Sequence, residues 1–296
     1  MSALLCFGFG YAAQHYVAAY GNRFDRIVGT TRSAESAALL SARRFGDRAV
    51  ETIVFDGGTA SPDLGAAINE ATTLVVSIAP DDGADPVLAR LGPAIARAPR
   101  LAMIVYLSTI AVYGNHDGRW IDETTPLTPI LSRAGDRIEA ERAWQALGVA
   151  RDVPVAVIRI AGIYGPGANA LVAVKAGRAR RIVKPGQVFN RIHVDDLAQI
   201  IEKAAIRGAD GVFNAADDEP SPPGDPIAFA ASLMGVPQPP EIAFDEARKT
   251  MTPMALSFYG ECKRVRNDRI KTVLGVSLRY PTYREGLRAL AASAPA

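Results

Sequence analysis

A glycine-rich run near the N-terminus has the residue types and spacing of a phosphate-binding turn. Gly8-Phe9-Gly10-Tyr11-Ala12-Ala13 fits the pattern Gly-x-Gly-x-x-Gly/Ala, and it stands between a short apolar run and a helical pattern. The first glycine permits a tight turn, the second lets the backbone approach a pyrophosphate, and the small third residue lets the helix pack against the strand. The helix N-terminus adds free N–H groups and a partial positive charge. The run therefore predicts a dinucleotide site.

The end of the second predicted strand indicates which dinucleotide. Gly29-Thr30-Thr31-Arg32 follows the glycines by about 20 residues, where enzymes that use NAD place Asp or Glu against the ribose 2′-hydroxyl. Arg32 offers a guanidinium that pairs well with a 2′-phosphate, and Thr31 offers a hydroxyl. The alternative is an ordinary surface arginine before a helix. The position favours NADP, and NAD stays open.

Asp56 follows the third predicted strand, in Asp-Gly-Gly. A carboxylate there can accept a hydrogen bond from the adenine amino group, or it can belong to an ordinary turn. Both interpretations stay open. The residues that we expect to contact the cofactor are Gly8, Gly10, Tyr11, Ala12, Thr31, Arg32, Asp56, Ala79 and Thr109.

Short apolar runs alternate with helical patterns over the first two-thirds of the chain. The predicted strands are Leu4–Phe7, Arg26–Gly29, Thr52–Phe55, Leu74–Ile78, Met103–Leu107 and Val155–Ile160, with Gly211–Ala215 as a seventh. Ser61-Pro62 and Asp85-Pro86 each place a capping side chain before a proline of the first helical turn. Such alternation predicts an α/β, Rossmann-type doubly wound parallel sheet of about seven strands, with helices on both faces.

The pattern changes after residue 216. A Pro/Gly-rich stretch at 219–226 predicts a linker, and mostly helical segments follow it. We therefore divide the chain into a dinucleotide-binding domain, residues 1–216, and a smaller C-terminal lobe, residues 217–296. Residues 165–190 are expected to contribute to the substrate side, because ligands of such sheets bind beyond the carboxyl ends of the strands.

Composition excludes several other classes of protein. The 33 basic and 31 acidic residues give a net charge of +2, which offers no bulk attraction to nucleic acid or membrane. Two distant cysteines and three histidines have no metal-ligand spacing. No stretch approaches the roughly 18 apolar residues of a membrane span, and no secretory signal is evident. We expect a cytoplasmic protein with a small-molecule substrate and no metal, and the sequence leaves a homodimer open.

Four further segments together resemble the extended and atypical short-chain dehydrogenases, the NAD-dependent epimerase/dehydratase family. The resemblance spans about residues 1–216, and a C-terminal run at 280–287 is similar to an atypical branch of nucleoside-diphosphate-sugar epimerases. The four segments are Tyr106–Gly114 (YLSTIAVYG), Asp122–Pro126 (DETTP), Arg159–Gly167 (RIAGIYGPG) and Arg191–Asp196 (RIHVDD).

The resemblance implies a set of catalytic positions, and one of them departs from the family. Ser or Thr at the place of Thr109 hydrogen-bonds the substrate oxygen, and a Tyr-x-x-x-Lys motif on the next helix supplies the proton donor and its cation. That helix, about 132–147, carries Arg133 and Arg137 instead. Arginine stays protonated at any working pH, so it can clamp an anion but cannot exchange protons. We expect Thr109, Arg133, Arg137 and Tyr113 at the catalytic site, with the proton coming from water, Tyr113, Tyr164 or the substrate.

Two functions remain open at this point. The first is an NADP-dependent oxidoreductase or epimerase/dehydratase-like enzyme that acts on a small polar or sugar-nucleotide-like substrate. The second is a non-catalytic NADP-binding sensor or interaction protein, favoured by the absence of Tyr-x-x-x-Lys from the expected helix. Fold alone does not decide between them, because function depends on the site.

Overall fold

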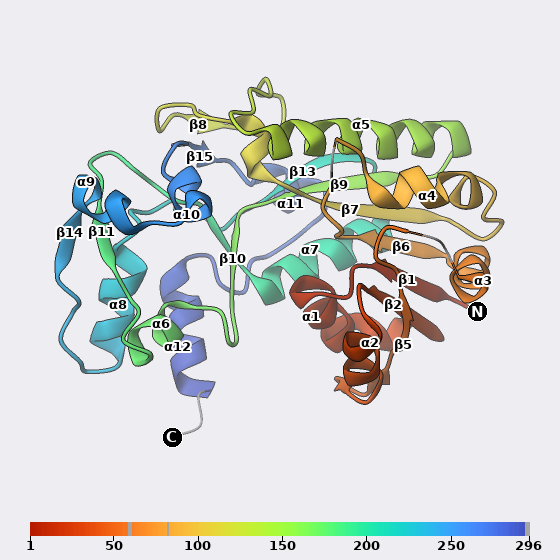
Figure 1. Ribbon diagram of the computed structural model, residues 1–296, viewed down its shortest axis with the longest axis horizontal. Coiled ribbons are helices and arrows are strands. Elements are labelled where there is room, and N and C mark those ends of the chain that lie inside the picture. Colours follow the sequence, from red (N-terminus) through yellow and green to blue (C-terminus); the bar gives the residue numbers. More distant parts are fainter. Residues whose placement is uncertain (59–60, 82, 294–296) are drawn as a thin grey trace.

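Seven parallel strands form the central sheet of the computed structural model, which describes residues 1–58, 61–81 and 83–293 (Figure 1). Their order is β13-β9-β7-β6-β1-β2-β5, and each adjacent pair is parallel. The prediction of a seven-stranded, doubly wound parallel sheet is confirmed. The strands are β1 (Ala3–Phe7), β2 (Arg26–Thr31), β5 (Glu51–Val54), β6 (Thr73–Val76), β7 (Met103–Thr109), β9 (Val155–Ile160) and β13 (Gly211–Ala215).

Both faces of the sheet are covered by helices, as strands that are apolar on both sides require. In β1, Leu4 and Cys6 belong to one hydrophobic cluster and Leu5 and Phe7 to another. The first cluster includes helices α1 (Tyr11–Tyr20) and α7 (Val194–Arg207). The second includes α3 (Pro62–Glu70), α4 (Pro86–Ile95) and α5 (Ser132–Arg151), which Figure 1 shows along the opposite side of the strands.

Local capping explains where three of these helices begin. The Ser61 side chain accepts a hydrogen bond from the Leu64 amide, and Asp85 accepts from the first turn of α4, as the Ser-Pro and Asp-Pro pairs predict. Helix α7 begins at Val194, and the His193 ring accepts a hydrogen bond from the Asp195 amide. Asp195 therefore lies in the first helical turn.

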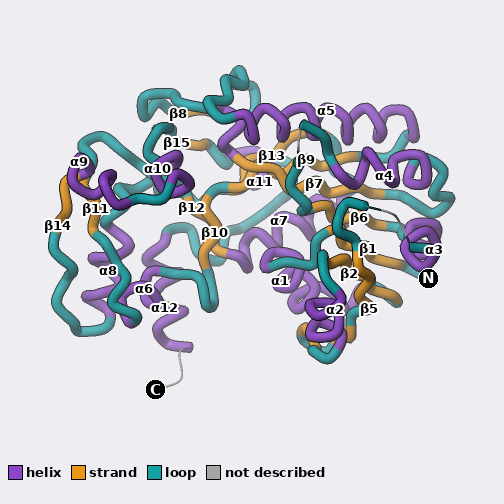
Figure 2. Tube along the Cα trace, viewed as in Figure 1, coloured by secondary structure: helices purple, strands orange, loops and turns teal. Residues whose placement is uncertain are grey.

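The remaining elements lie beyond the carboxyl ends of β7 and β9 or at the edges of the sheet (Figure 2). Short parallel pairs join β10 (Gly162–Tyr164) to β12 (Arg191–His193), β11 (Arg181–Val183) to β14 (Glu241–Ala243) and β8 (Trp120–Ile121) to β15 (Arg264–Val265). The antiparallel pair β3 (Arg44–Phe45) and β4 (Arg48–Ala49) was not predicted. The other helices are α2 (Ala34–Ser41), α6 (Ala170–Lys175), α8 (Asp225–Leu233), α9 (Phe244–Ala247), α10 (Pro253–Phe258), α11 (Asp268–Thr272) and α12 (Tyr283–Ser293).

Segments from both sides of residue 216 build this second region. Strand β11 pairs with β14, and α6 packs against α8, so residues 165–190 accompany the C-terminal segments. The division of the chain at residue 216 stays a prediction. Within the described ranges, no helix has both the length and the apolar composition needed to cross a membrane.

A buried ion pair ties helix α5 to the sheet. Arg159, on β9, donates to both carboxylate oxygens of Glu141, and its Nη2 lies 2.7 Å from Oε2. Ser108, on β7, donates to the same carboxylate. Arg159 also donates to the Tyr113 hydroxyl at 2.9 Å, and that hydroxyl donates to the Asn214 side chain of β13 at 2.8 Å. Each charge is therefore paired and hydrogen-bonded, which is the condition under which charges are stable in an interior.

Removing one charge of this pair should be costly. We expect Glu141→Ala to lower the free energy of unfolding by about 3–5 kcal/mol, because Arg159 then stays buried without its partner. Glu139→Ala is the matched control, since Glu139 pairs with Arg142 at an exposed surface of the same helix, where a pair contributes about 0.5 kcal/mol or less. Urea denaturation measures both. A loss below about 1 kcal/mol for Glu141→Ala would show that the network does not hold α5.

Candidate functional site

The turn between β1 and α1 has the backbone that the glycine pattern predicts. Gly8 has φ +88°, and a Cβ there would lie 2.6 Å from the Ser77 hydroxyl, so both conformation and space require glycine. Gly10 caps α1 without a side-chain hydrogen bond, and a Cβ there would meet nothing within 4 Å. The first N–H groups of α1 therefore have no side-chain cap, and the space in front of Gly10 is open. This arrangement suits a pyrophosphate at the helix N-terminus.

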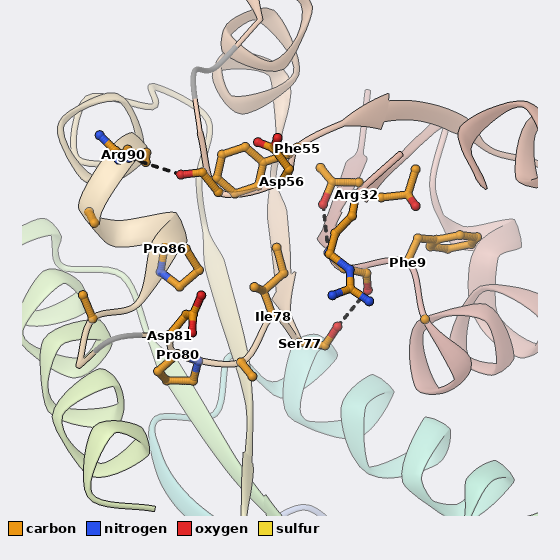
Figure 3. Close-up of a pocket in the computed structure, with 18 residues that line it drawn as sticks. Phe9, Arg32, Phe55, Asp56, Ser77, Ile78, Pro80, Asp81, Pro86 and Arg90 are labelled. Carbon is orange, nitrogen blue, oxygen red and sulfur yellow. Dashed lines mark hydrogen bonds between the residues drawn. The ribbon is translucent and has the colours of Figure 1, made fainter. Parts of the chain in front are cut away.

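A cavity of about 870 Å³ lies at this turn, at the carboxyl ends of β1, β2 and β6 (Figure 3). Six of the nine residues expected to contact the cofactor line it: Gly8, Gly10, Thr31, Arg32, Asp56 and Ala79. Tyr11 and Ala12 are outside this lining, and the Tyr11 hydroxyl donates to the Pro166 carbonyl oxygen at 3.0 Å. Thr109 lines a different cavity. The volume lies within the range of small-molecule and cofactor sites, which is roughly 300–1,000 Å³.

Arg32 is an exposed cation on this lining. Figure 3 shows its side chain between Phe9 and Ile78 in that view. Among the residues that the structure describes, its guanidinium has neither a hydrogen-bond acceptor nor an ion-pair partner. A guanidinium with all its donors available is suited to bidentate binding of a phosphate.

Asp56 combines the two interpretations that the sequence left open. One of its carboxylate oxygens accepts a hydrogen bond from the Gly58 amide at 2.8 Å, which is the geometry of a turn. The residue also lines the cavity, beside Phe55 and Gly57. Sequence reasoning did not find Arg90, whose Nε donates to the Gly57 carbonyl oxygen at 3.1 Å (Figure 3). Arg90 comes from α4, where no motif marks it.

A second cavity, of about 430 Å³, lies at the carboxyl ends of β7 and β9. Thr109 lines it, and its hydroxyl oxygen accepts a hydrogen bond from the Ala111 amide at 3.2 Å, which begins the 3-10 helix η2 (Ile110–Tyr113). In the described part of the chain, the Thr109 hydroxyl hydrogen has no acceptor. It therefore remains available to a ligand. Of the other predicted catalytic residues, Arg133 also lines this cavity.

Arg133 and Arg137 lie on one side of α5 but have different partners. Arg133 donates to the Ser257 hydroxyl at 2.8 Å and to the Met254 sulfur, so it joins α5 to α10. Arg137 donates to the Leu107 carbonyl oxygen at 3.0 Å and to the Tyr106 hydroxyl at 3.2 Å, at the end of β7. Arg137 is not on the lining of the second cavity. Their joint action as an anion clamp stays a prediction.

Tyr113 is fully buried, outside the linings of both cavities. Its hydroxyl has two protein partners, Arg159 and Asn214. Burial raises the pKa of Tyr113 to about 12, although the neighbouring Arg159 charge opposes the shift. The catalytic role of Tyr113 stays a prediction, and these contacts give it a structural role.

Lys263 is a cavity residue that sequence reasoning missed. Its ammonium is buried, donates to the Gly114 carbonyl oxygen at 2.7 Å, and forms an ion pair with Glu261. Burial lowers the pKa of Lys263 from its usual value. A signal was present: Tyr259 and Lys263 have the Tyr-x-x-x-Lys spacing, outside the expected helix. The ring of Tyr259 instead packs against Phe189 and Phe244, and Tyr259 is not on the lining of the second cavity.

Arg191 is another cation on the lining of the second cavity, and a third cavity of about 260 Å³ also borders it. Its Nη1 donates to the Ser221 hydroxyl at 2.7 Å and to the Phe189 carbonyl oxygen at 3.1 Å. The neighbouring Asp217 carboxyl is 2% exposed, and burial raises its pKa to about 8. Tyr164 lines both cavities, and burial raises the pKa of its phenol.

No group of three or more His, Cys, Asp or Glu side chains within the described ranges is arranged to hold a metal ion.

The comparisons with known proteins support the fold. No protein-family model matches the sequence. A functionally unknown conserved protein from Silicibacter pomeroyi DSS has a solved structure with 49% identity and a TM-score of 0.86, covering 99% of each chain. The dTDP-glucose 4,6-dehydratase from Bacillus anthracis, solved in complex with NAD, has 18% identity and a TM-score of 0.77, covering 99% of this chain and 96% of that one. A curated relative, the 3-diazoavenalumate denitrifying reductase of a Streptomyces species, is 26% identical over 175 residues.

The fold and the two cavities define a Rossmann-type protein with the architecture of the NAD-dependent epimerase/dehydratase and short-chain dehydrogenase enzymes, which confirms the resemblance seen in the sequence. The chain belongs to the same family as the Silicibacter pomeroyi protein. Its match to the reductase covers 56% of this chain and 58% of the reductase. The likeness to the dehydratase, at 18% identity, shows the fold alone.

Proposed function

We propose that this protein is an NADP-dependent oxidoreductase that acts on a carbonyl group of a small substrate. The observation that carries the proposal is the pairing of two cavities, one at the glycine turn with Arg32 and one at the end of β7 with Thr109. The N-terminus of α1 would hold the pyrophosphate and Arg32 the 2′-phosphate. The presence of NAD in the dehydratase complex supports a nicotinamide cofactor here. When bound, that cofactor supplies or accepts a hydride.

Residues of the second cavity would bind the substrate carbonyl group and supply the proton. The Thr109 hydroxyl would donate to the substrate carbonyl oxygen, since its hydrogen has no acceptor among the described residues. Lys263 would donate the proton that the oxygen gains on reduction, in the place that tyrosine has in the resembling enzymes. Its lowered pKa makes it a stronger acid than an exposed lysine, and its third N–H is left over after Gly114 and Glu261 take the other two.

A non-catalytic NADP-binding protein is the second candidate. The observation that favours it is the engagement of Arg133 and Arg137 by Ser257 and Leu107, where the resembling enzymes place tyrosine and lysine. Turnover is the difference between the two candidates, because both require the cofactor cavity.

One prediction of this proposal concerns the choice between NADP and NAD. We expect Arg32→Ala to weaken NADP binding by about 10- to 100-fold, since hydrogen bonds to a charged group contribute about 1.5–3 kcal/mol. NAD, which has no 2′-phosphate, should lose less than about threefold. Calorimetric titration of both nucleotides measures the two affinities. Arg43→Ala is the control, because Arg43 is equally exposed and does not line the cavity. Equal affinities for NADP and NAD in the unchanged protein would make Arg32 an ordinary surface residue.

The second prediction concerns turnover. We expect NADPH oxidation with at least one member of a panel of aldehydes, ketones and nucleotide sugars. With that compound, Thr109→Ala should lower kcat/KM by about 10- to 100-fold, because one donor to the developing oxyanion is lost. Thr109→Ser keeps the hydroxyl and should retain most activity, and NADPH affinity should change in neither variant. A wild-type protein that binds NADPH but reduces nothing in the panel would support the non-catalytic candidate.

A further inference from the structure

The second cavity contains more positive than negative side chains. Three cations line it, Arg133, Arg191 and Lys263, against one carboxylate, Glu261. Arg133 is directed to Ser257, and Lys263 is paired with Glu261. Arg191 is different, because within the described residues no carboxylate lies at ion-pair distance from it.

A buried guanidinium without a counter-ion is costly unless a ligand supplies one. The Arg191 side chain is mostly buried, and its two hydrogen bonds, to Phe189 and Ser221, both use Nη1. The nearby Asp217 carboxyl is not at ion-pair distance from Arg191 among the described residues, and burial raises its pKa to about 8, which weakens its negative charge at neutral pH. Nε and Nη2 of Arg191 have no acceptor among the described residues, and Arg191 lines both the second and the third cavity, with its guanidinium 5.9 Å from the centroid of the Tyr283 ring.

The rest of the lining is apolar or already hydrogen-bonded. The apolar side chains with the largest surfaces are Leu131, Ile160, Ile163, Val188, Phe189 and Phe258. The Asn190 side-chain amide donates to the Lys263 carbonyl oxygen and accepts from the Val265 amide. The Ser257 hydroxyl accepts from Arg133 and donates to the Met254 carbonyl oxygen. Sugar hydroxyls need both donors and acceptors from their site, and an unmatched hydroxyl in such a pocket is unfavourable.

We propose that the second cavity binds an organic carboxylate with an apolar body of aromatic size and a carbonyl group, in preference to a sugar nucleotide. The carboxylate is held by Arg191, the apolar body by the aliphatic and aromatic walls, and the carbonyl oxygen by Thr109 and Lys263. Only one part of this inference, the binding of the carbonyl group by Thr109 and Lys263, rests on the proposed function. A cavity of about 430 Å³ is at the small end of ligand sites and suits a single ring with two substituents.

Three ligands test the substrate class on the unchanged protein. Calorimetry with NADP⁺ already bound, which cannot donate a hydride to an aldehyde, gives the affinity for 4-carboxybenzaldehyde, for methyl 4-formylbenzoate and for UDP-glucose. We expect the acid to bind at least about tenfold more tightly than its uncharged methyl ester, and UDP-glucose to bind more weakly than both. Equal affinities of acid and ester, no binding of either aromatic compound, or tighter binding of UDP-glucose would each refute the proposal.

Two variants locate the two ends of the ligand. Arg191→Gln should abolish the preference for acid over ester while the ester still binds, whereas Arg178→Gln, which removes an exposed arginine away from both cavities, should keep the preference. The ratio of affinities does not depend on how much protein folds. Should Arg191→Gln not fold, Phe258→Ala removes a half-exposed side chain from the wall. It should weaken the acid and the ester equally, and unchanged affinities would contradict the assignment of the apolar body.

The same samples separate this inference from the proposed function. NADP⁺ is titrated first, and a failure to bind it contradicts the proposed function alone. The ligand series is then run on cofactor-free protein, where the preference for the acid over the ester is still expected because Arg191 belongs to the chain itself.

Discussion

The arrangement of the site depends on the buried ion pair between Glu141 and Arg159. Helix α5 contributes Glu141, β9 contributes Arg159, and β7 contributes Ser108 to the same carboxylate. These contacts fix one helix against β7 and β9, the two strands whose carboxyl ends border the second cavity. If the two charges moved apart, their attraction would no longer offset the cost of removing them from water. The ion pair therefore fixes the position of α5 closely. Arg137 and Arg133, about one and two turns earlier on that helix, are positioned by it.

The sheet topology provides the second constraint. All seven strands are parallel, so their carboxyl ends, and the loops that leave them, meet at one edge. The glycine turn after β1 and Thr109 at the end of β7 reach the same edge from strands separated by β6. Each cavity also contains a cation on its lining, Arg32 in the first and Arg191 in the second.

The sheet and the cofactor turn were predictable from sequence because their signals are local. Buried parallel strands are apolar on both faces. The glycine pattern predicts a tight turn, and Gly8 has the positive φ that such a turn requires. The β3–β4 hairpin was missed because its strands have two residues each. Lys263 was missed as a cavity residue because its segment reaches the site through pairing between distant parts of the chain, which no periodicity records. Arg133 stands on α5 where the resemblance implies tyrosine, whereas Lys263 lies in a different segment of the chain.

A crystal structure of the protein with NADP⁺ tests the central claim, that the glycine turn and Arg32 form an NADP site beside the Thr109 cavity. We predict the 2′-phosphate at the Arg32 guanidinium, the pyrophosphate at the Gly10 end of α1, and the nicotinamide ring next to Thr109. Density for the nucleotide at any other place on the protein would contradict the account. So would a bound nucleotide whose nicotinamide ring points away from the cavity that Thr109 and Lys263 line.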